Sequence, residues 1–282
     1  MANVHDRSAE MPTQSQLVLS LFSGVGLLDS GFEQAGFCVV RGPEKIVGGD
    51  VRTFSAISGR FDGVVGGSPC QDFSRARRTP PTGEGLELLG HFCRVVVEAK
   101  PDWFLLENVP GVPDVHIEGY TVQRFSLCPT ELGHSQSRLR HFQFGSKRGI
   151  VLSVNRRAFT GTRQRCVMAS EGLRSDNRRQ WSDFCQLQGL PASFELTEFH
   201  RAAKYRAVGN GVHIAVANEI GRAVHAATTA NEPTTVYNSR LCECGCGRLL
   251  NGRKHQKTAT ASCRKRYELK RKRESPVMHT WS

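Results

Sequence analysis

Short apolar runs that alternate with glycine-rich loops and helical segments occupy the first 108 residues, and this alternation constrains the fold most. Gln16–Phe22 is an apolar run of strand length, followed by the loop SGVG and by helical spacing over Leu27–Phe37. The runs FCVVRGPE, FDGVVGG and PDWFLLEN are also strand-like, and a helix is expected over Gly85–Ala99. This order predicts a doubly wound α/β fold, with a parallel sheet covered by helices on both faces.

Polar and reactive side chains follow these predicted strands at the points where they end. Such sheets bind ligands beyond the carboxyl ends of their strands. Phe22-Ser23-Gly24 follow the first run, and Glu44 follows the second. Pro69-Cys70 follow the third run, and Glu107-Asn108 close the fourth. We therefore expect these groups to face one crevice.

The first loop and two acidic residues indicate a cofactor site. Glu44 comes twenty residues after Gly24, the distance at which a second strand offers a carboxylate to ribose hydroxyls. The loop lacks the G-x-G-x-x-G spacing and no lysine completes a phosphate loop, so a cofactor without phosphates fits better than a dinucleotide. Asp50 is a second acceptor, for instance for an adenine amino group. A turn or cap role for either carboxylate is the alternative.

Cys70 and Glu107 form the pair with the clearest chemistry. A thiolate is a strong nucleophile, and the loop after Cys70 is rich in arginine. A carboxyl group whose pKa is raised by burial can donate a proton. Reaction at carbon 5 of cytosine uses both a nucleophile and an acid. Carbon 5 becomes nucleophilic only after carbon 6 is attacked, and protonation at N3 eases that attack. The alternative is that Cys70 is a small core residue.

Five motifs then match one family in order and approximate spacing: SLFSGVG, GGSPCQDFS, LLENV, QSRLRHFQFG and AVGNGV. Over about Leu17 to Val224 the chain resembles DNA (cytosine-5)-methyltransferases. The resemblance implies the Rossmann-like fold of class I S-adenosylmethionine-dependent methyltransferases. It also implies methyl transfer to carbon 5 of a flipped cytosine in double-stranded DNA through a covalent cysteine adduct.

The resemblance assigns roles to individual residues. Cys70 would be the nucleophile and Glu107 the N3 partner, while Arg140 would hold the cytosine O2 with Arg138 nearby. The loop SRARRTPPTGEG would close on the flipped base. The cofactor-binding residues implied are Phe22, Ser23, Gly24, Val25, Glu44, Asp50, Val51, Pro69, Leu88, Asn210 and Gly211.

The chain departs from the family pattern in several places. Ser68 stands where a second proline is usual, and His213 where proline is common. Only about five residues separate Glu44 from Asp50, so the helix normally found there is expected to be missing or collapsed. About 35 residues stand where the family inserts a larger target-recognition region, so base reading in the major groove is expected to be limited.

The predicted organisation is a disordered arm (1–16), a catalytic domain (17–148), a short recognition region (149–180), a return to the catalytic domain (181–229), a linker (230–239) and a basic tail (240–282). No apolar run is long enough for a membrane span, and the start lacks the pattern of a signal peptide. The six cysteines from Cys38 to Cys185 are expected to be reduced thiols in a cytoplasmic protein.

The tail carries most of the net charge of +12, with 12 Lys+Arg against 3 Asp+Glu from Arg240 onward. Such a segment favours contact with DNA phosphates, although a solvated tail is the alternative. Four cysteines could bind a structural zinc ion, with His255 as a substitute ligand. Unstructured cysteines or disulfides are the alternatives. The predicted ligands are Cys242, Cys244, Cys246 and Cys263.

Two other functions remain open from the sequence. A transfer-RNA cytosine-5 methyltransferase would share the same motifs and a reduced recognition region. A non-catalytic DNA-binding protein would use the tail alone, although intact Cys70, Glu107 and Arg140 argue against it. For the main hypothesis we expect a monomer, encoded by a phage or by a restriction–modification or self-protection system, with a cognate restriction endonuclease as a candidate partner.

Overall fold

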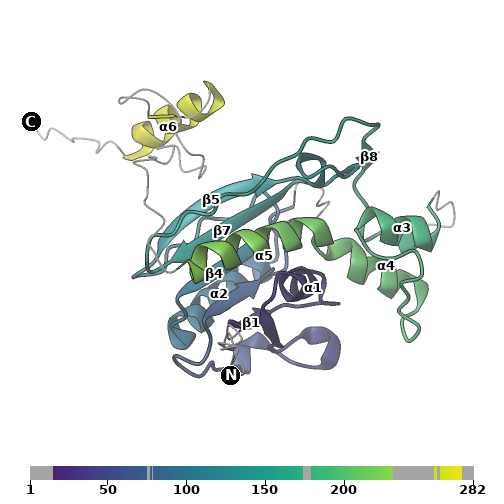
Figure 1. Cartoon of the computed structure of the whole chain (residues 1–282), viewed down its shortest axis with the longest axis horizontal. Coiled ribbons are helices and arrows are strands. Elements are labelled where there is room, and N and C mark those ends of the chain that lie inside the picture. The colour runs from purple at the N-terminus through teal and green to yellow at the C-terminus, as the bar shows by residue number, and fades with distance from the viewer. Residues whose placement is uncertain are drawn as a thin grey trace, which may run out of the picture.

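A computed structural model gives the fold of residues 15–74, 77, 79–173, 179–230, 257–258 and 261–274. Its centre is a six-stranded sheet in the order β2-β1-β3-β4-β7-β5 (Figure 1). The strands are β1 (Leu17–Leu21), β2 (Cys38–Arg41), β3 (Gly63–Gly66), β4 (Trp103–Asn108), β5 (Thr121–Leu127) and β7 (Arg140–Ser146).

The four strands predicted from the sequence are confirmed and run parallel to one another. The expectation of a wholly parallel sheet is wrong, because β7 runs antiparallel to both β4 and β5. The reason lies in the connections. The chain passes from β4 to β5 and from β5 to β7 without an α-helix, and a parallel neighbour needs a long crossover connection. The sheet is therefore mixed.

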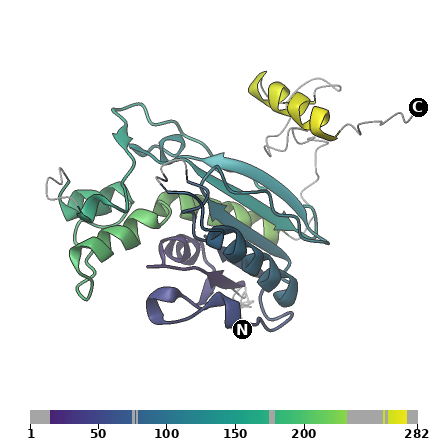
Figure 2. The ribbon, with the colours of Figure 1, turned by 180° about the vertical axis from the view of Figure 1, so that it is seen from behind.

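Helices cover both faces of the sheet, as predicted. α1 (Leu27–Gln34) and α5 (Ile214–Thr229) pack on one face, and α2 (Glu84–Ala99) packs on the other (Figures 1 and 2). The alternation along β1 explains this, since Val18 joins the core under α1 and α5 while Leu19 joins the core under α2. Burial on both faces fixes the strand register and hence the positions of the strand ends.

Two single 3-10 turns, η1 (Lys45–Val47) and η2 (Val51–Thr53), occupy the connection from β2 to β3. The prediction that the usual helix is missing here is therefore confirmed. The remaining elements form the end of the molecule beside α4: η3 (Pro129–Glu131), β6 (Gln136–Ser137), β8 (Gln164–Arg165), η4 (Glu171–Leu173), α3 (Trp181–Leu187) and α4 (Arg201–Asn210). A third core cluster, including Phe184, Tyr205 and Val208, packs α3 against α4.

Part of the basic tail forms the helix α6 (Ala261–Glu274). Burial lowers the pKa of His141 in β7, and the charges of Arg124 and of Arg266 in α6 lower it further. Cys242, Cys244, Cys246 and His255 lie outside the described residues, as do residues 231–239 of the predicted linker and 1–14 of the predicted arm. Within the described part of the chain, no group of three or more His, Cys, Asp or Glu side chains could hold a metal ion.

Gln16, which lies where the predicted arm meets the first predicted strand, is tied to the core. Its side chain donates to Thr228 in α5 and accepts a hydrogen bond from Trp103 in β4. The six cysteines from Cys38 to Cys185 form no disulfide in the structure. Among the helices that the structure describes, none is both long and apolar enough to cross a membrane.

Candidate active site

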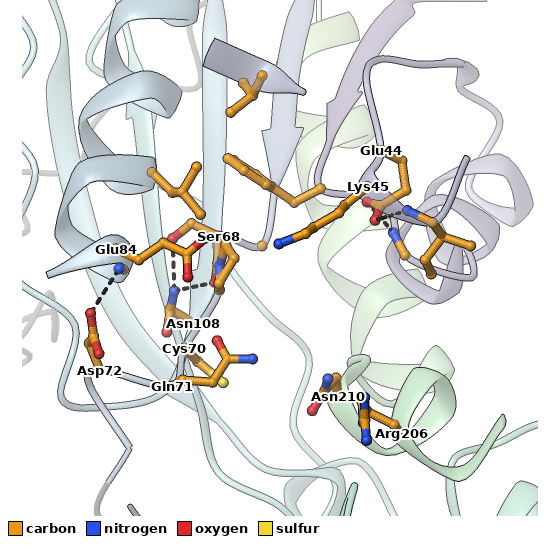
Figure 3. Close-up of a pocket in the computed structure, with 18 of the residues that line it drawn as sticks. Glu44, Lys45, Ser68, Cys70, Gln71, Asp72, Glu84, Asn108, Arg206 and Asn210 are labelled. Carbon is orange, nitrogen blue, oxygen red and sulfur yellow. Dashed lines mark hydrogen bonds between the residues drawn. The ribbon is translucent and has the colours of Figure 1, made fainter. Parts of the chain in front are cut away.

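A cleft of about 850 Å³ opens at the carboxyl edge of the parallel strands (Figure 3). The register explains its floor. Leu21, Gly66 and Leu106 pair across β1, β3 and β4, so the residues that follow them end side by side at this edge. The sequence-predicted residues that line the cleft are Phe22, Gly24, Glu44, Asp50, Val51, Pro69, Cys70, Leu88, Glu107, Arg140 and Asn210.

Cys70 lies in a loop that is held from both sides. Asn108 donates to the Ser68 carbonyl (2.9 Å) and to the Ser68 hydroxyl (3.0 Å), and both residues are buried. On the far side, Asp72 accepts hydrogen bonds from the amides of Thr82 and Gly85. The second contact ties the loop to the start of α2. The thiol position is therefore set by β4 and α2 together, and Ser68 supplies an acceptor that proline would lack.

Glu107 and Arg140 meet beside this loop. The Arg140 Nε atom lies 3.1 Å from Glu107 Oε1, and the two side chains are only 14% and 12% exposed. A Cβ at Gly67 would come within 2.9 Å of Glu107 Oε2, so the carboxyl group fits here because Gly67 has no side chain. β7 brings Arg140 here by pairing antiparallel with β4. The antiparallel strand thus contributes directly to the site.

Burial sets the protonation of both reactive groups. It raises the pKa of Glu107, while Arg140 and Arg138 oppose the shift. It also raises the pKa of the Cys70 thiol, and the nearby Glu107 carboxylate raises it further. Arg140 and Arg138 again act in the opposite direction. Burial and the charge on Glu107 therefore both make the Cys70 thiolate harder to form, and the two arginines make it easier to form.

Arg138 does not lie with Arg140 at the cleft, contrary to the expectation from the sequence. Its side chain is buried, and its guanidinium donates to the carbonyls of Gly209 and Gly211, each at 2.7 Å. The same group also donates to the Val167 carbonyl and the Cys166 sulfur. These contacts fix the end of α4, which carries Asn210. Arg138 can act on the cleft only through its charge and through this scaffold.

Three predicted cofactor residues also lie outside the cleft lining. The Ser23 hydroxyl donates to Ser20 Oγ, and Val25 packs against the third core cluster. Gly211 closely approaches Leu27, since a Cβ at Gly211 would lie 2.5 Å from Leu27 Cδ1. These residues support the loop after β1 and the end of α4.

Glu44 and Asp50 both act as caps and both face the cleft. Glu44 accepts hydrogen bonds from the amides of Gly24 (2.9 Å) and Ile46 (3.2 Å). Asp50 accepts from the Arg52 amide at 2.9 Å, which lowers the pKa of Asp50. Each carboxylate oxygen can accept a further hydrogen bond, so capping leaves capacity for a ligand. The two readings of these residues from the sequence are compatible.

The residues that line the cleft fit S-adenosylmethionine. Phe22, Val51 and Leu88 give the cleft an apolar wall, and Glu44 and Asp50 offer acceptors for hydroxyl and amino groups. Asn108 also lines the cleft, as expected from its place beside Glu107 at the end of β4. Sequence reasoning assigned no role in the site to further lining residues, which include Lys45, Ser68, Asp72 and Arg206 (Figure 3). Ser68 and Asp72 lie in the motif around Cys70, whereas Lys45 and Arg206 lie in no quoted motif.

Residues 17–171 match the family model for the C-5 cytosine-specific DNA methylase. The chain belongs to this family. The fold agrees, since the Entamoeba histolytica methyltransferase EhMeth superposes with a TM-score of 0.59 at 13% identity, covering 77% of this chain and 100% of that one. The S. pombe Dnmt2 methyltransferase gives 0.54 at 14% identity, covering 75% and 99%.

Curated relatives of this family member include two bacterial enzymes. The Type II methyltransferase M.FnuDI of Fusobacterium nucleatum is 32% identical over 169 residues, 48% of each chain. The Type II methyltransferase M.NgoPII of Neisseria gonorrhoeae is 32% identical over 170 residues, 49% of this chain and 50% of that protein. The chain thus spans about half the length of these relatives.

Proposed function

We propose that this protein transfers a methyl group from S-adenosylmethionine to carbon 5 of cytosine in DNA. One observation carries the proposal: Cys70, Glu107 and Arg140 line the same cleft as Glu44 and Asp50. A nucleophile and an acid are thereby placed beside a site suited to adenosine. Membership of the methylase family, and Type II methyltransferases as relatives, support the same substrate.

The cofactor would lie between Phe22, Val51 and Leu88, with Glu44 and Asp50 accepting its polar hydrogens and Asn210 at its carboxylate end. When bound, it supplies an electrophilic methyl group. Lys45 points its ammonium group into the cleft, where it adds positive charge (Figure 3). None of these residues resembles a phosphate-binding loop, which agrees with a cofactor that has no phosphates.

The protein residues perform the remaining chemistry on the cytosine ring. The Cys70 thiolate adds to carbon 6 while Glu107 donates a proton toward N3, so carbon 5 gains electron density. Arg140 donates to O2 and stabilises the charge that develops on the ring. After methylation, solvent water accepts the proton of carbon 5, and the electrons of that C–H bond re-form the C5–C6 double bond. Cys70 then leaves carbon 6 as a thiolate, and Glu107 recovers the N3 proton.

In duplex DNA the cytosine must leave the stack, at a cost of a few kcal/mol. The loop from Cys70 to α2 is anchored by Asp72, and Arg77 donates to the Asp72 carbonyl (2.6 Å). An arginine-rich loop anchored at both ends can contact phosphates while the base is extruded. Base flipping and loop closure are thus part of the proposal.

The tail would add contacts that do not depend on sequence. α6 carries basic residues over most of its length, so it would bind phosphates while the short segment at 149–180 would read bases. A zinc ion bound by Cys242, Cys244, Cys246 and Cys263 would link the start of α6 to the cysteine-containing segment before it. Deletion of residues 239–282 should weaken DNA binding and flatten its salt dependence. Unchanged affinity and salt slope would contradict this role.

Transfer of a labelled methyl group from S-adenosylmethionine by the purified protein tests the substrate. Duplex DNA should be labelled and transfer RNA should not, and the label should be lost in Glu107→Gln. Labelling of transfer RNA alone would replace the DNA proposal with an RNA one. Cofactor binding without transfer to either substrate would favour a non-catalytic DNA-binding protein. Solution scattering of the protein alone would test whether it is a monomer. Scattering with a candidate restriction endonuclease would test whether the two proteins bind each other.

A further inference from the structure

The segment that carries Asp50 is attached to α2 by side chains rather than by a helix of its own. It contains only the single turn η2, and the helix that the family normally has between Glu44 and Asp50 is missing. Val51 is 4% exposed and packs in the core beside Leu88. A single 3-10 turn provides little rigidity by itself. The position of Asp50 in the cleft must therefore depend on other contacts.

Arg52 makes the first attachment. Its Nε atom donates to Glu87 Oε1 at 2.8 Å and its Nη2 atom to Glu87 Oε2 at 3.3 Å, a forked pair. Glu84, one turn earlier in α2, lies 3.6 Å from the same guanidinium. Arg52 also reaches Asp50 through Nη1, but at the longer distances of 3.3 and 3.4 Å. The acidic face of α2 therefore competes with Asp50 for this arginine.

Arg94 makes the second attachment from α2 itself. Its Nη2 atom donates to the Val51 carbonyl at 2.8 Å, and its Nη1 atom pairs with Glu98 at 2.5 Å. Glu98 in turn accepts a hydrogen bond from the Ala56 amide at 3.2 Å. Glu87, Arg94 and Glu98 lie on one face of α2, at spacings of seven and four residues. One face of the helix thus holds the segment from Asp50 to Ala56 at three points.

These contacts leave Asp50 with an acceptor for a ligand. Its Oδ1 atom receives the Arg52 amide, whereas Oδ2 has only the long contact to Arg52 Nη1. As long as Glu87 engages Arg52, the Oδ2 atom keeps capacity for an amino group in the cleft. If Glu87 lost its charge, Arg52 would turn fully to Asp50 and occupy that oxygen.

We propose that Arg94, together with the Arg52–Glu87 pair, positions the Asp50–Val51 segment for the adenosine part of the cofactor. The proposal rests on the proposed function, because it concerns the same cofactor site. Arg94 is not one of the described residues that line the cleft, so it acts on the cleft through its hydrogen bond to the carbonyl of Val51. Its effect should appear in cofactor affinity and in the KM for the cofactor. The kcat at saturating cofactor should change little.

Calorimetric titration of the full chain with S-adenosylhomocysteine tests the proposal. Arg94→Met and Glu87→Gln should each weaken binding about tenfold, since a hydrogen bond that orders the site is lost. Arg94→Lys keeps one donor near the Val51 carbonyl and should recover much of the affinity. Arg156→Met is the matched control, since Arg156 forms a comparable exposed pair with Glu131 on another part of the surface. It should bind as the wild type does.

The outcomes separate this inference from the proposed function. If the wild type does not bind S-adenosylhomocysteine, the proposed cofactor is wrong. If the wild type binds and Arg94→Met binds equally well, the positioning role of Arg94 is wrong, and equal binding by Glu87→Gln overturns that of the Arg52–Glu87 pair. A raised KM for the cofactor with an unchanged kcat supports positioning. A loss of kcat alone, or equal losses in Arg94→Lys and Arg94→Met, contradicts it.

Discussion

Asn108, the last residue of β4, donates two hydrogen bonds to Ser68, one to its carbonyl (2.9 Å) and one to its hydroxyl (3.0 Å). Ser68 lies two residues before Cys70. The carboxyl end of one strand thereby fixes the loop that follows its neighbour. Both side chains are almost inaccessible to solvent, so no water could readily replace the Asn108 amide as a hydrogen-bond donor to Ser68.

We expect Asn108→Ala to lower the free energy of unfolding by about 1–3 kcal/mol, because the Ser68 carbonyl would lose its partner in a buried site. Methyl transfer should fall more than stability alone explains, since the Cys70 loop loses its support. Ser68→Ala removes one of the two bonds and should cost about 1 kcal/mol. Denaturant titration and single-turnover kinetics measure both effects. Equal activity in Asn108→Ala and the wild type would show that the loop needs no such support.

The pKa of the Cys70 thiol should respond to its two charged neighbours in opposite directions. Glu107→Gln should lower the pKa of Cys70, because a negative charge that disfavours the thiolate is removed. Arg140→Met should raise it, because a positive charge is lost. The rate of Cys70 alkylation against pH, followed by mass spectrometry of its peptide, gives both values. A shift of the same sign in both variants would contradict the electrostatic account.

Gly31 and Gly90 are both helical glycines, and they should respond oppositely to alanine. A Cβ at Gly31 in α1 would lie 2.3 Å from the Ala217 Cβ in α5, so Gly31→Ala should destabilise by about 1–3 kcal/mol. Nothing lies within 4 Å of a Cβ at Gly90 in α2, so Gly90→Ala should stabilise by up to about 1 kcal/mol. Thermal unfolding measures both. Destabilisation by Gly90→Ala would mean that α2 packs differently.

His213 should make the fold sensitive to acid. Burial, reinforced by His134 and Arg138, lowers the pKa of His213 to about 3. The unfolded chain binds a proton near pH 6.5 while the folded chain does not, so stability is lost as the pH falls below about 6.5. Between pH 7.5 and pH 5 the contribution of this group is about 2 kcal/mol.

His213→Asn should remove that contribution, since asparagine can still cap α5 but does not titrate. Urea titrations at pH 7.5 and pH 5 compare the two proteins. The wild type should lose about 2 kcal/mol more than the variant over this interval. Equal losses would show that His213 is protonated in the folded protein.

The positions of the reactive groups could be predicted because strand ends determine them. Cys70 and Glu107 follow buried apolar runs, and runs of this kind are recognised from composition and length. The place of β7 could not be predicted, because strand order depends on contacts between distant segments. The difference between Arg138 and Arg140 was hidden for the same reason. Only the tertiary structure shows that the Arg138 guanidinium donates to a carbonyl at the end of α4, whereas the Arg140 guanidinium pairs with Glu107.

The attachment of the Asp50 segment illustrates another limit. The short spacing from Glu44 to Asp50 predicted a missing helix, and two 3-10 turns confirm it. Nothing in the sequence pattern indicates that Arg94, more than forty residues later, supports this segment by its hydrogen bond to the Val51 carbonyl. Long-range side-chain contacts of this type have no periodic pattern, so a single sequence does not reveal them.

The central claim is that Cys70 is the nucleophile of a DNA cytosine-5 methyltransferase. Bisulfite sequencing of plasmid DNA from cells that express the wild type, Cys70→Ser or Cys93→Ser tests it most directly. Cys93 is a partly buried cysteine of α2 outside the cleft lining, so Cys93→Ser is the matched control. The account predicts methylcytosine in a short sequence context with the wild type and Cys93→Ser, and none with Cys70→Ser. Methylation that persists in Cys70→Ser would contradict it.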